Sequence, residues 1–284
     1  MSNKAFYFSS TDGLRLYAQT WVGEEAPQAC FFIVHGMGEH SGRYTHLVNF
    51  LVENHFQVFA FDLRGHGLSA GQKGHTPNYA QLLKDIETFI QQSHAQFETA
   101  HLPAFLYGHS MGGNQVLNYV LKKMPDYNTF KGIISSSAYL KLAFNPPPIK
   151  IALGKFVNSI YPKFSQSTNL DVKAISKDPA VVEAYTKDPL VHDKISASFF
   201  LSTSQAALFA LEEAPRFSLP LLLYHGTADK LTSIEGSKEF ASKAPKNLTT
   251  TQWFEGGFHE LHNDSEKEQL FPLMLNWLKQ QLNA

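Results

Sequence analysis

The chain has 284 residues, a formal net charge of −1 at pH 7 and a hydrophobic share of 43%. This length suffices for one large domain with an inserted subdomain, and the near-neutral charge argues against a nucleic-acid partner. The single cysteine, Cys30, excludes an internal disulfide. No apolar run is long enough to span a bilayer, and residues 1–10 lack the pattern of a signal peptide, so we expect a cytoplasmic protein.

The first half of the chain alternates strand and helix signals. Residues 6–8 and 14–21 flank a Thr11-Asp12-Gly13 turn and predict an antiparallel hairpin. Two apolar runs, residues 30–34 and 56–61, predict buried strands. Residues 79–93 carry apolar side chains at helical spacing, and residues 103–107 form another apolar run.

The second half continues this pattern after an interruption. Strands are predicted at residues 132–134, 220–224 and 250–254, and a terminal helix at residues 271–282. Strands that alternate with helices indicate a doubly wound sheet. We therefore expect an α/β fold with a mostly parallel, eight-stranded sheet that is flanked by helices.

Residues 141–213 break the alternation. The segment opens near Pro146-Pro147-Pro148 and carries two helical patterns, residues 149–161 and 195–211, with no strand signal between them. We interpret it as a helical cap inserted after the sixth strand, between core parts 1–140 and 214–284. Active sites in such folds lie beyond the carboxyl ends of the strands, so a cap would cover the site. The alternative is a set of extra helices that pack away from the site.

The most informative motif is Gly108-His109-Ser110-Met111-Gly112-Gly113. It follows the apolar run 103–107 and precedes a helical pattern at residues 114–123. A Gly-x-Ser-x-Gly sequence between a strand and a helix is the nucleophile elbow of α/β-hydrolases, in which the serine sits on a tight turn above the sheet. Ser110 is therefore the candidate nucleophile. The alternative is a Ser/Gly-rich turn without chemistry.

A serine nucleophile needs a base, and the base needs an acid that orients it. His259 lies in a glycine-containing loop between the last strand and the last helix, where the base of this fold belongs. Asp229 follows the strand before and is the candidate acid, with Glu255 as the runner-up. Of the nearby histidines, His225 is expected to pack at the strand end and His262 to lie on the surface or at a helix start.

Two backbone N–H groups should stabilise the oxyanion. One is the N–H of Met111, directly after the nucleophile, and the other is assigned to Met37 in the loop His35-Gly36-Met37-Gly38-Glu39-His40. No metal is expected, because the two histidines at 259 and 262 are three residues apart and a metalloprotease helix needs four. No phosphate-binding loop is present either.

Longer motifs resemble the monoacylglycerol lipase and lysophospholipase branch of the serine α/β-hydrolases over nearly the whole chain. The motifs are residues 35–44, 62–67, 108–113, 185–190, 226–231 and 255–262. The resemblance implies an enzyme without a cofactor that cleaves the ester between one fatty acyl chain and a glycerol-type head group. It also implies a movable apolar cap and peripheral contact with membranes through that cap, and it says nothing about oligomeric state.

The same resemblance places four residues near a small polar pocket for glycerol: Glu39, Arg43, His109 and Tyr185. Their structural alternatives are a salt bridge at a helix start for Glu39 and Arg43, and packing for His109 and Tyr185. Met37 is larger than the small residue common at this position in the mammalian enzyme. Its side chain could narrow the site, while its backbone donor is unaffected.

The sequence thus predicts a serine hydrolase that converts monoacylglycerols to fatty acid and glycerol through a Ser-Asp-His triad and an acyl-enzyme. The alternatives are a lysophospholipase, a general carboxylesterase or thioesterase on the same frame, and a non-catalytic binding protein with a hydrolase fold. Because His259 must be neutral to act as a base, we expect activity to fall below a pH of about 6.5.

Overall fold

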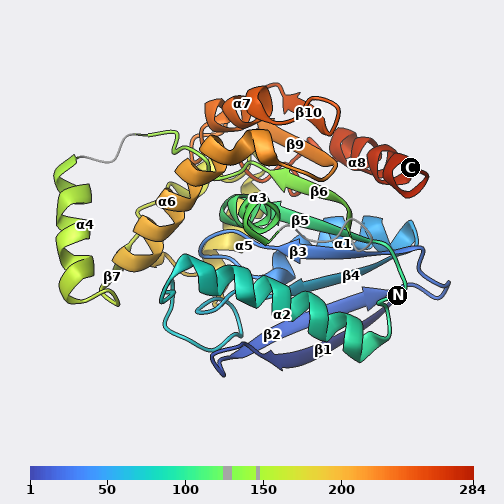
Figure 1. The fold of residues 1–284 in the computed structure, drawn as a ribbon, viewed down its shortest axis with the longest axis horizontal. Helices are drawn as coiled ribbons and strands as arrows, with labels where there is room; N and C mark the ends of the chain where they lie inside the picture. Colours follow the sequence, from blue (N-terminus) through green and yellow to red (C-terminus); the bar gives the residue numbers. More distant parts are fainter. Residues whose placement is uncertain (124–129, 145–147) are drawn as a thin grey trace.

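The computed structural model describes residues 1–123, 130–144 and 148–284. Eight strands form one sheet in the order β1-β2-β4-β3-β5-β6-β9-β10 (Figure 1). They are β1 (Ser2–Ser9), β2 (Arg15–Val22), β3 (Ala29–Val34), β4 (Phe56–Phe61), β5 (Ala104–His109), β6 (Phe130–Ser136), β9 (Leu221–Gly226) and β10 (Thr249–Phe254). The β1–β2 and β2–β4 pairs are antiparallel and the other pairs are parallel, so the predicted mostly parallel, eight-stranded sheet is confirmed.

The central strands are apolar throughout because helices cover both faces of the sheet. Every residue of β3, β4, β5 and β9 is buried, as expected for parallel strands in such a layered fold. One face packs against α1 (Thr45–Glu53) and α8 (Lys267–Leu282). The other packs against α2 (Tyr79–Phe97), α3 (Met111–Lys123) and α7 (Ile234–Lys243).

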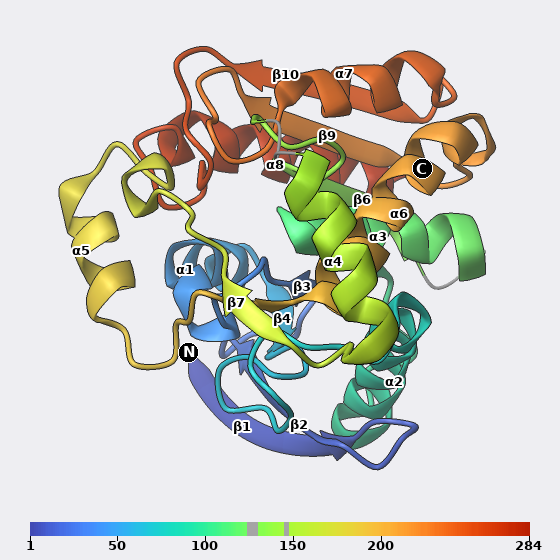
Figure 2. The same cartoon turned by 90° about the vertical axis from the view of Figure 1, so that its left-hand side faces the viewer.

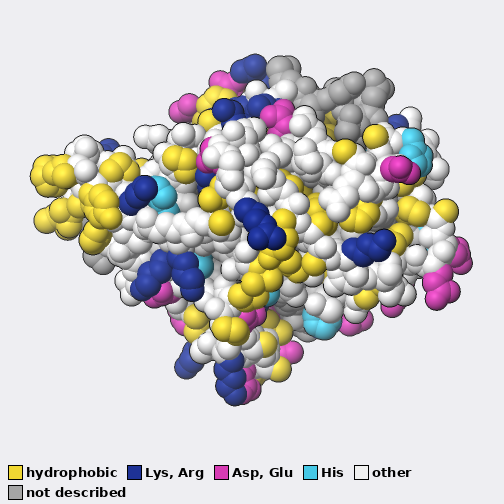
Figure 3. All heavy atoms as spheres, turned by 90° about the horizontal axis from the view of Figure 1, so that it is seen from below, with side chains coloured by type: hydrophobic (Ala, Val, Ile, Leu, Met, Phe, Trp, Pro, Cys, Tyr) yellow, Lys and Arg dark blue, Asp and Glu magenta, His cyan; other side chains and the backbone are white. Residues whose placement is uncertain are grey.

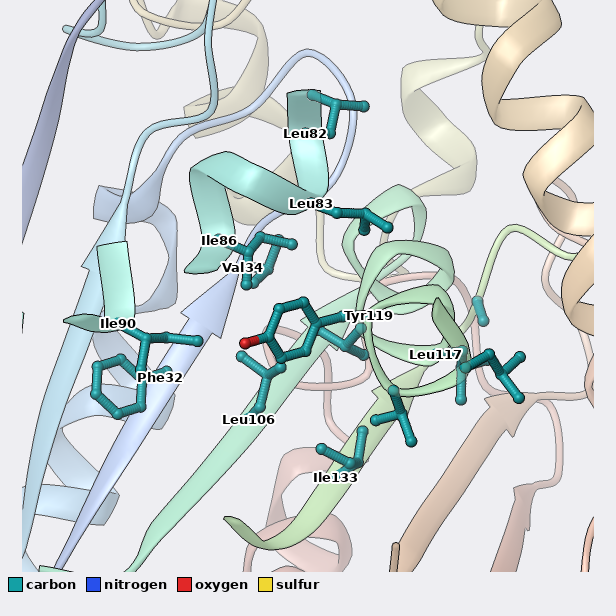
Figure 4. Packing of buried hydrophobic residues seen from close by; sticks show 14 of the residues in the cluster. Phe32, Val34, Leu82, Leu83, Ile86, Ile90, Leu106, Leu117, Tyr119 and Ile133 are labelled. Carbon is teal, nitrogen blue, oxygen red and sulfur yellow. The ribbon is translucent and has the colours of Figure 1, made fainter. Parts of the chain in front are cut away.

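Side-chain alternation along β3 divides these two cores. Phe32 and Val34 point to the α2 and α3 side, whereas Phe31 and Ile33 point to the α1 and α8 side. Figure 4 shows the first core, in which leucine and isoleucine side chains of α2 meet β3 and Leu106 of β5. Dense packing on both faces holds the strand ends, and the loops that follow them, in fixed positions.

The described part of the segment between β6 and β9 holds three α-helices and a two-stranded sheet. These elements are α4 (Pro148–Ile160), β7 (Ser165–Ser167), α5 (Pro179–Lys187), β8 (Lys194–Ser196) and α6 (Ala197–Glu213). Figure 2 shows α4, β7 and α5 on the side of the molecule that faces the viewer. Of the three prolines expected at the start of this segment, Pro146 and Pro147 lie outside the described residues.

This segment also contains two short strands, for which the sequence carries no strand signal. β7 and β8 pair antiparallel, with Ser165 opposite Ser196. Strands of three residues are too short to show alternation, and their partners lie far apart in the chain, so no local pattern indicates them. Ser196 also caps α6, because its side chain accepts from the N–H of Phe199. The helix therefore starts two residues later than predicted.

No helix in the described ranges combines the length and apolar character that a membrane span requires.

Candidate active site

Ser110 lies in a sharp turn between β5 and α3. Its φ angle is +56°, in the left-handed region that non-glycine residues rarely adopt. The turn is possible because glycines flank it: a Cβ on Gly112 would lie 2.1 Å from the carbonyl oxygen of Val34. The N–H of Ser110 donates to the carbonyl of Ser136 at 2.8 Å, which ties the turn to β6. A strained, half-buried serine at such an elbow fits the predicted nucleophile.

Asp229 and His259 meet across two loops. Oδ2 of Asp229 lies 2.7 Å from Nδ1 of His259, and both side chains are buried. Ser137 Oγ donates to the carbonyl of His259 at 2.9 Å and fixes the loop from the β6 side. The structure thus brings the predicted acid and base together, whereas the runner-up acid Glu255 is exposed.

The charge of Asp229 dominates the electrostatics of this pair. Burial lowers the pKa of His259, but the charge and hydrogen bond of Asp229, together with the charges of Glu260 and Glu39, raise this pKa above its ordinary value. Burial raises the pKa of Asp229, yet the side chains of His259 and His225 hold it well below its ordinary value. Asp229 is therefore ionised at neutral pH, and His259 is a stronger base than a free imidazole.

Two further histidines make contacts that the sequence does not indicate. His225 is buried at the end of β9, as expected, and its Nε2 also lies 3.1 Å from Oδ2 of Asp229. His262, expected on the surface or at a helix start, is fully buried and stacks on Tyr44 with ring centroids 4.7 Å apart. Burial lowers the pKa of His262 to about 3. The residues around a polar side chain in the sequence do not show which partner will contact it in the fold.

The loop after β3 carries the predicted oxyanion donor. His35 Nε2 accepts from the N–H of Leu63 at 2.9 Å, and Glu39 Oε1 accepts from the N–H of Gly36 at 2.7 Å. These two contacts hold the loop on either side of Met37. Among the residues that the structure describes, the N–H groups of Met37 and Met111 have no protein acceptor, so both are free to donate to a ligand.

Arg43 lies between two buried carboxylates. Its guanidinium donates to both oxygens of Glu260 at 2.6 and 2.8 Å and to Oε2 of Glu39 at 3.2 Å. The ring of Tyr185 stacks on it, with Cζ 4.5 Å from the ring centroid. Burial raises the pKa of Glu39, and the nearby charge of Glu260 adds to that effect, while Arg43 opposes it. The expected ion pair between Glu39 and Arg43 is formed, but Arg43 makes its two shorter contacts to Glu260. Glu260 was not among the candidate residues of the sequence analysis.

A cavity of about 680 Å³ joins these groups. Ser110 and His259 line it together with Met37 and Met111. Three of the four residues expected near a head group also reach its wall: Glu39, His109 and Tyr185. Arg43 lies behind Glu39 and Tyr185. The rest of the wall is largely apolar and comes from the segment between β6 and β9, including Leu153, Val157, Phe164, Ile195, Phe200 and Leu201. A cavity of this size suits a small organic molecule with a long apolar part.

Comparisons with known proteins show which proteins the chain resembles. A family model described as serine aminopeptidase, S33, matches residues 25–266. An abhydrolase domain-containing protein of Dictyostelium discoideum is 35% identical over 283 residues, which make up 99% of this chain but 30% of that protein. A monoacylglycerol lipase of Mycolicibacterium smegmatis is 28% identical over 272 residues, or 95% of each chain. The crystal structure of Paleococcus ferrophilus monoacylglycerol lipase superposes with a TM-score of 0.84 at 35% identity, covering 94% of this chain and 99% of that chain.

Proposed function

The chain belongs to the serine aminopeptidase S33 family of α/β-hydrolases, and from this premise we propose that it hydrolyses long-chain monoacylglycerols to fatty acid and glycerol. It is a carboxylic ester hydrolase of the monoglyceride lipase type. The observation that carries the proposal is the shared cavity. Ser110 on its strained turn and His259, which is bonded to the buried Asp229, line this cavity. A long apolar wall lines the rest of it.

The proposed mechanism is acyl transfer through Ser110. His259 takes the proton from the Ser110 hydroxyl as its oxygen attacks the ester carbonyl, and the N–H groups of Met37 and Met111 stabilise the oxyanion. His259 then gives the proton to the departing glycerol oxygen, which leaves an acyl-enzyme. Water repeats the sequence and releases the fatty acid. Asp229 holds the Nδ1–H tautomer of His259 and stabilises the imidazolium that forms.

The two ends of the substrate fit different walls of the cavity. Glu39, His109 and Tyr185 supply polar atoms beside Ser110 for the glycerol hydroxyls. Residues 141–213 act as the proposed cap, and the apolar side chains of this segment would bury the acyl chain. Each buried methylene contributes about 0.8 kcal/mol, so a long chain should bind more tightly than a short one.

We also propose that α4 contacts a lipid surface. The apolar side chains of Ile149, Phe156 and Ile160 are 77%, 63% and 68% exposed. Figure 3 shows hydrophobic side chains gathered at the end of the molecule where α4 lies. An exposed apolar patch of this kind marks an interaction site. Phe156 and Ile160 lie outside the cavity lining, so replacing both by serine should weaken binding to phosphatidylcholine vesicles while hydrolysis of a water-soluble short-chain ester persists.

The direct test compares fatty-acid release from a long-chain monoacylglycerol, a matched lysophospholipid and a triacylglycerol. We expect the monoacylglycerol to be preferred and the activity to disappear in Ser110→Ala. A fluorophosphonate, which reacts with activated serines, should label the wild type and not the variant. Labelling of Ser110 without release from any of the three lipids would refute the substrate while keeping the triad. No labelling at all would refute the mechanism.

A further inference from the structure

A second histidine contacts the aspartate of the proposed triad. His225 is the penultimate residue of β9 and is fully buried. Its Nε2 lies 3.1 Å from Oδ2 of Asp229, the oxygen that also lies 2.7 Å from Nδ1 of His259. One carboxylate oxygen is therefore shared by two imidazole rings. Thr232 Oγ1 approaches the same oxygen at 2.9 Å.

The surroundings of His225 select one tautomer. Nε2 faces two acceptors, Oδ2 of Asp229 and the carbonyl oxygen of Thr232 at 3.2 Å, so Nε2 must carry the proton. Nδ1 lies 2.8 Å from Oγ of Ser237 and accepts from that hydroxyl. A chain of hydrogen bonds thus runs from Ser237 of α7, through the ring of His225, to Asp229. A histidine that served only to fill space would need neither contact.

We propose that His225 is a positioning residue for the hydrolysis: its Nε2–H orients the Asp229 carboxylate and limits how strongly that carboxylate binds His259. The inference rests on the proposed function, because it assigns His225 a task within the same triad. The outer oxygen, Oδ1, is already held by the N–H groups of Leu231 and Thr232 at 2.8 and 3.1 Å. His225 supplies the corresponding restraint on Oδ2, the oxygen on which the base depends.

Loss of the Nε2 donor should have two effects. The carboxylate becomes less well oriented, which lowers the rate even where His259 is fully neutral. Donors that share one oxygen compete for it, so the remaining bond to His259 strengthens and the imidazolium is stabilised. The acid limb of the pH profile should therefore move to higher pH. Glu39 and Glu260 also raise the pKa of His259, but neither contacts His225 and both stay unchanged in the variants.

Three substitutions separate the donor from the volume of the ring. His225→Gln places an amide nitrogen near the position of Nε2 and can still donate to Asp229. His225→Asn places its amide near Nδ1, so it can contact Ser237 but not Asp229. His225→Leu fills a similar volume with an apolar side chain and removes the contacts to both Ser237 and Asp229. Thermal melting confirms that each variant folds, and the comparison of the glutamine and asparagine variants suffices if the leucine variant does not.

The readout avoids any assumption about the natural substrate. The rate of Ser110 labelling by a fluorophosphonate is measured from pH 5 to pH 9, and the downfield proton NMR signal of the His259 Nδ1–H is titrated in parallel. We expect a fall of about tenfold or more in the plateau rate for the asparagine and leucine variants, with the acid limb and the NMR midpoint both moved to higher pH. The glutamine variant should stay within about threefold of wild type.

Two results would overturn the inference while leaving the proposed function intact. In one, the asparagine or leucine variant keeps the wild-type plateau and midpoint. In the other, the glutamine variant is impaired as much as the asparagine variant, which would assign His225 a packing role. If the wild type is labelled but releases no fatty acid from monoacylglycerol, the proposed substrate is wrong. The pH profiles of Ser110 labelling then still decide the role of His225. A wild type that is not labelled refutes both.

Discussion

Replacing Arg43 by methionine tests the electrostatics of the proposed head-group region. Methionine keeps much of the length and volume of the arginine stem and removes the guanidinium. The two carboxylates of Glu39 and Glu260 then lose their shared cation, although both side chains remain almost fully buried, at 4% and 3% exposure. An unpaired buried charge is far more costly than an exposed one.

The magnitude follows from the number of contacts. Arg43 donates three hydrogen bonds to two carboxylates at 2.6, 2.8 and 3.2 Å. Removing one partner of a buried pair costs about 3–5 kcal/mol, and two orphaned carboxylates favour the upper part of that range. At about 2 °C per kcal/mol for a chain of this size, we expect the melting temperature to fall by roughly 8–10 °C.

The loss should depend on pH with a definite sign. Without Arg43, the pKa values of both buried carboxyls rise above those of the unfolded chain. Between the unfolded and folded pKa values the folded state then binds protons that the unfolded state does not, so stability decreases as the pH rises. The destabilisation should therefore be larger at pH 8 than at pH 5.

Urea unfolding of the wild type and Arg43→Met at these two pH values measures the effect. Arg216→Met is the matched control, because Arg216 makes an equally short contact of 2.6 Å to Glu213 but is 62% exposed. An exposed pair contributes under about 1 kcal/mol. If both variants lose the same stability, or if the loss in Arg43→Met does not grow from pH 5 to pH 8, the burial argument is wrong.

Three further predictions concern the reaction. Because the pKa of His259 is raised, the acid limb of kcat/KM should lie above a pH of about 6.5, and a midpoint below that value would contradict the role of Asp229. Asp229→Asn should lower kcat by a factor on the order of 10⁴, since an amide cannot favour the required tautomer; a loss under tenfold would remove Asp229 from the mechanism. Gly38→Ala should reduce kcat at least about tenfold, because its Cβ would meet the carbonyl oxygen of His192 at 2.4 Å beside the oxyanion loop. Gly13→Ala, at a similar positive φ but in open space, should leave kcat near wild type.

The sheet and the candidate triad could be predicted from local patterns. Ser110 and Asp229 follow strands with a strong apolar signal, and His259 follows the last strand of the sheet. Parallel strands end at one edge of a sheet. Topology alone therefore brings the three loops to the same place. The same reasoning selects the loop after β3 as the candidate source of the second oxyanion donor.

The contacts that refine the site could not be predicted in this way. Arg43 and Glu260 are 217 residues apart, and their pairing depends on how the turn before α1 and the loop after β10 pack together. The β7–β8 pair likewise joins segments whose own sequences carry no strand signal. Such contacts are consequences of packing, which local periodicity does not encode.

His225 and His262 show why residue type and chain position are not enough. His225 lies at the end of β9 and His262 lies in the loop after β10, and both are fully buried, yet they differ in what they contact. His262 stacks on Tyr44, and burial lowers its pKa to about 3, so it remains neutral and apolar in effect. His225 meets a hydroxyl on one nitrogen and a carboxylate on the other. The position of α7 supplies that hydroxyl, and the loop after β9 supplies that carboxylate. A role for His225 in orienting Asp229 therefore becomes visible only when both neighbours are in place.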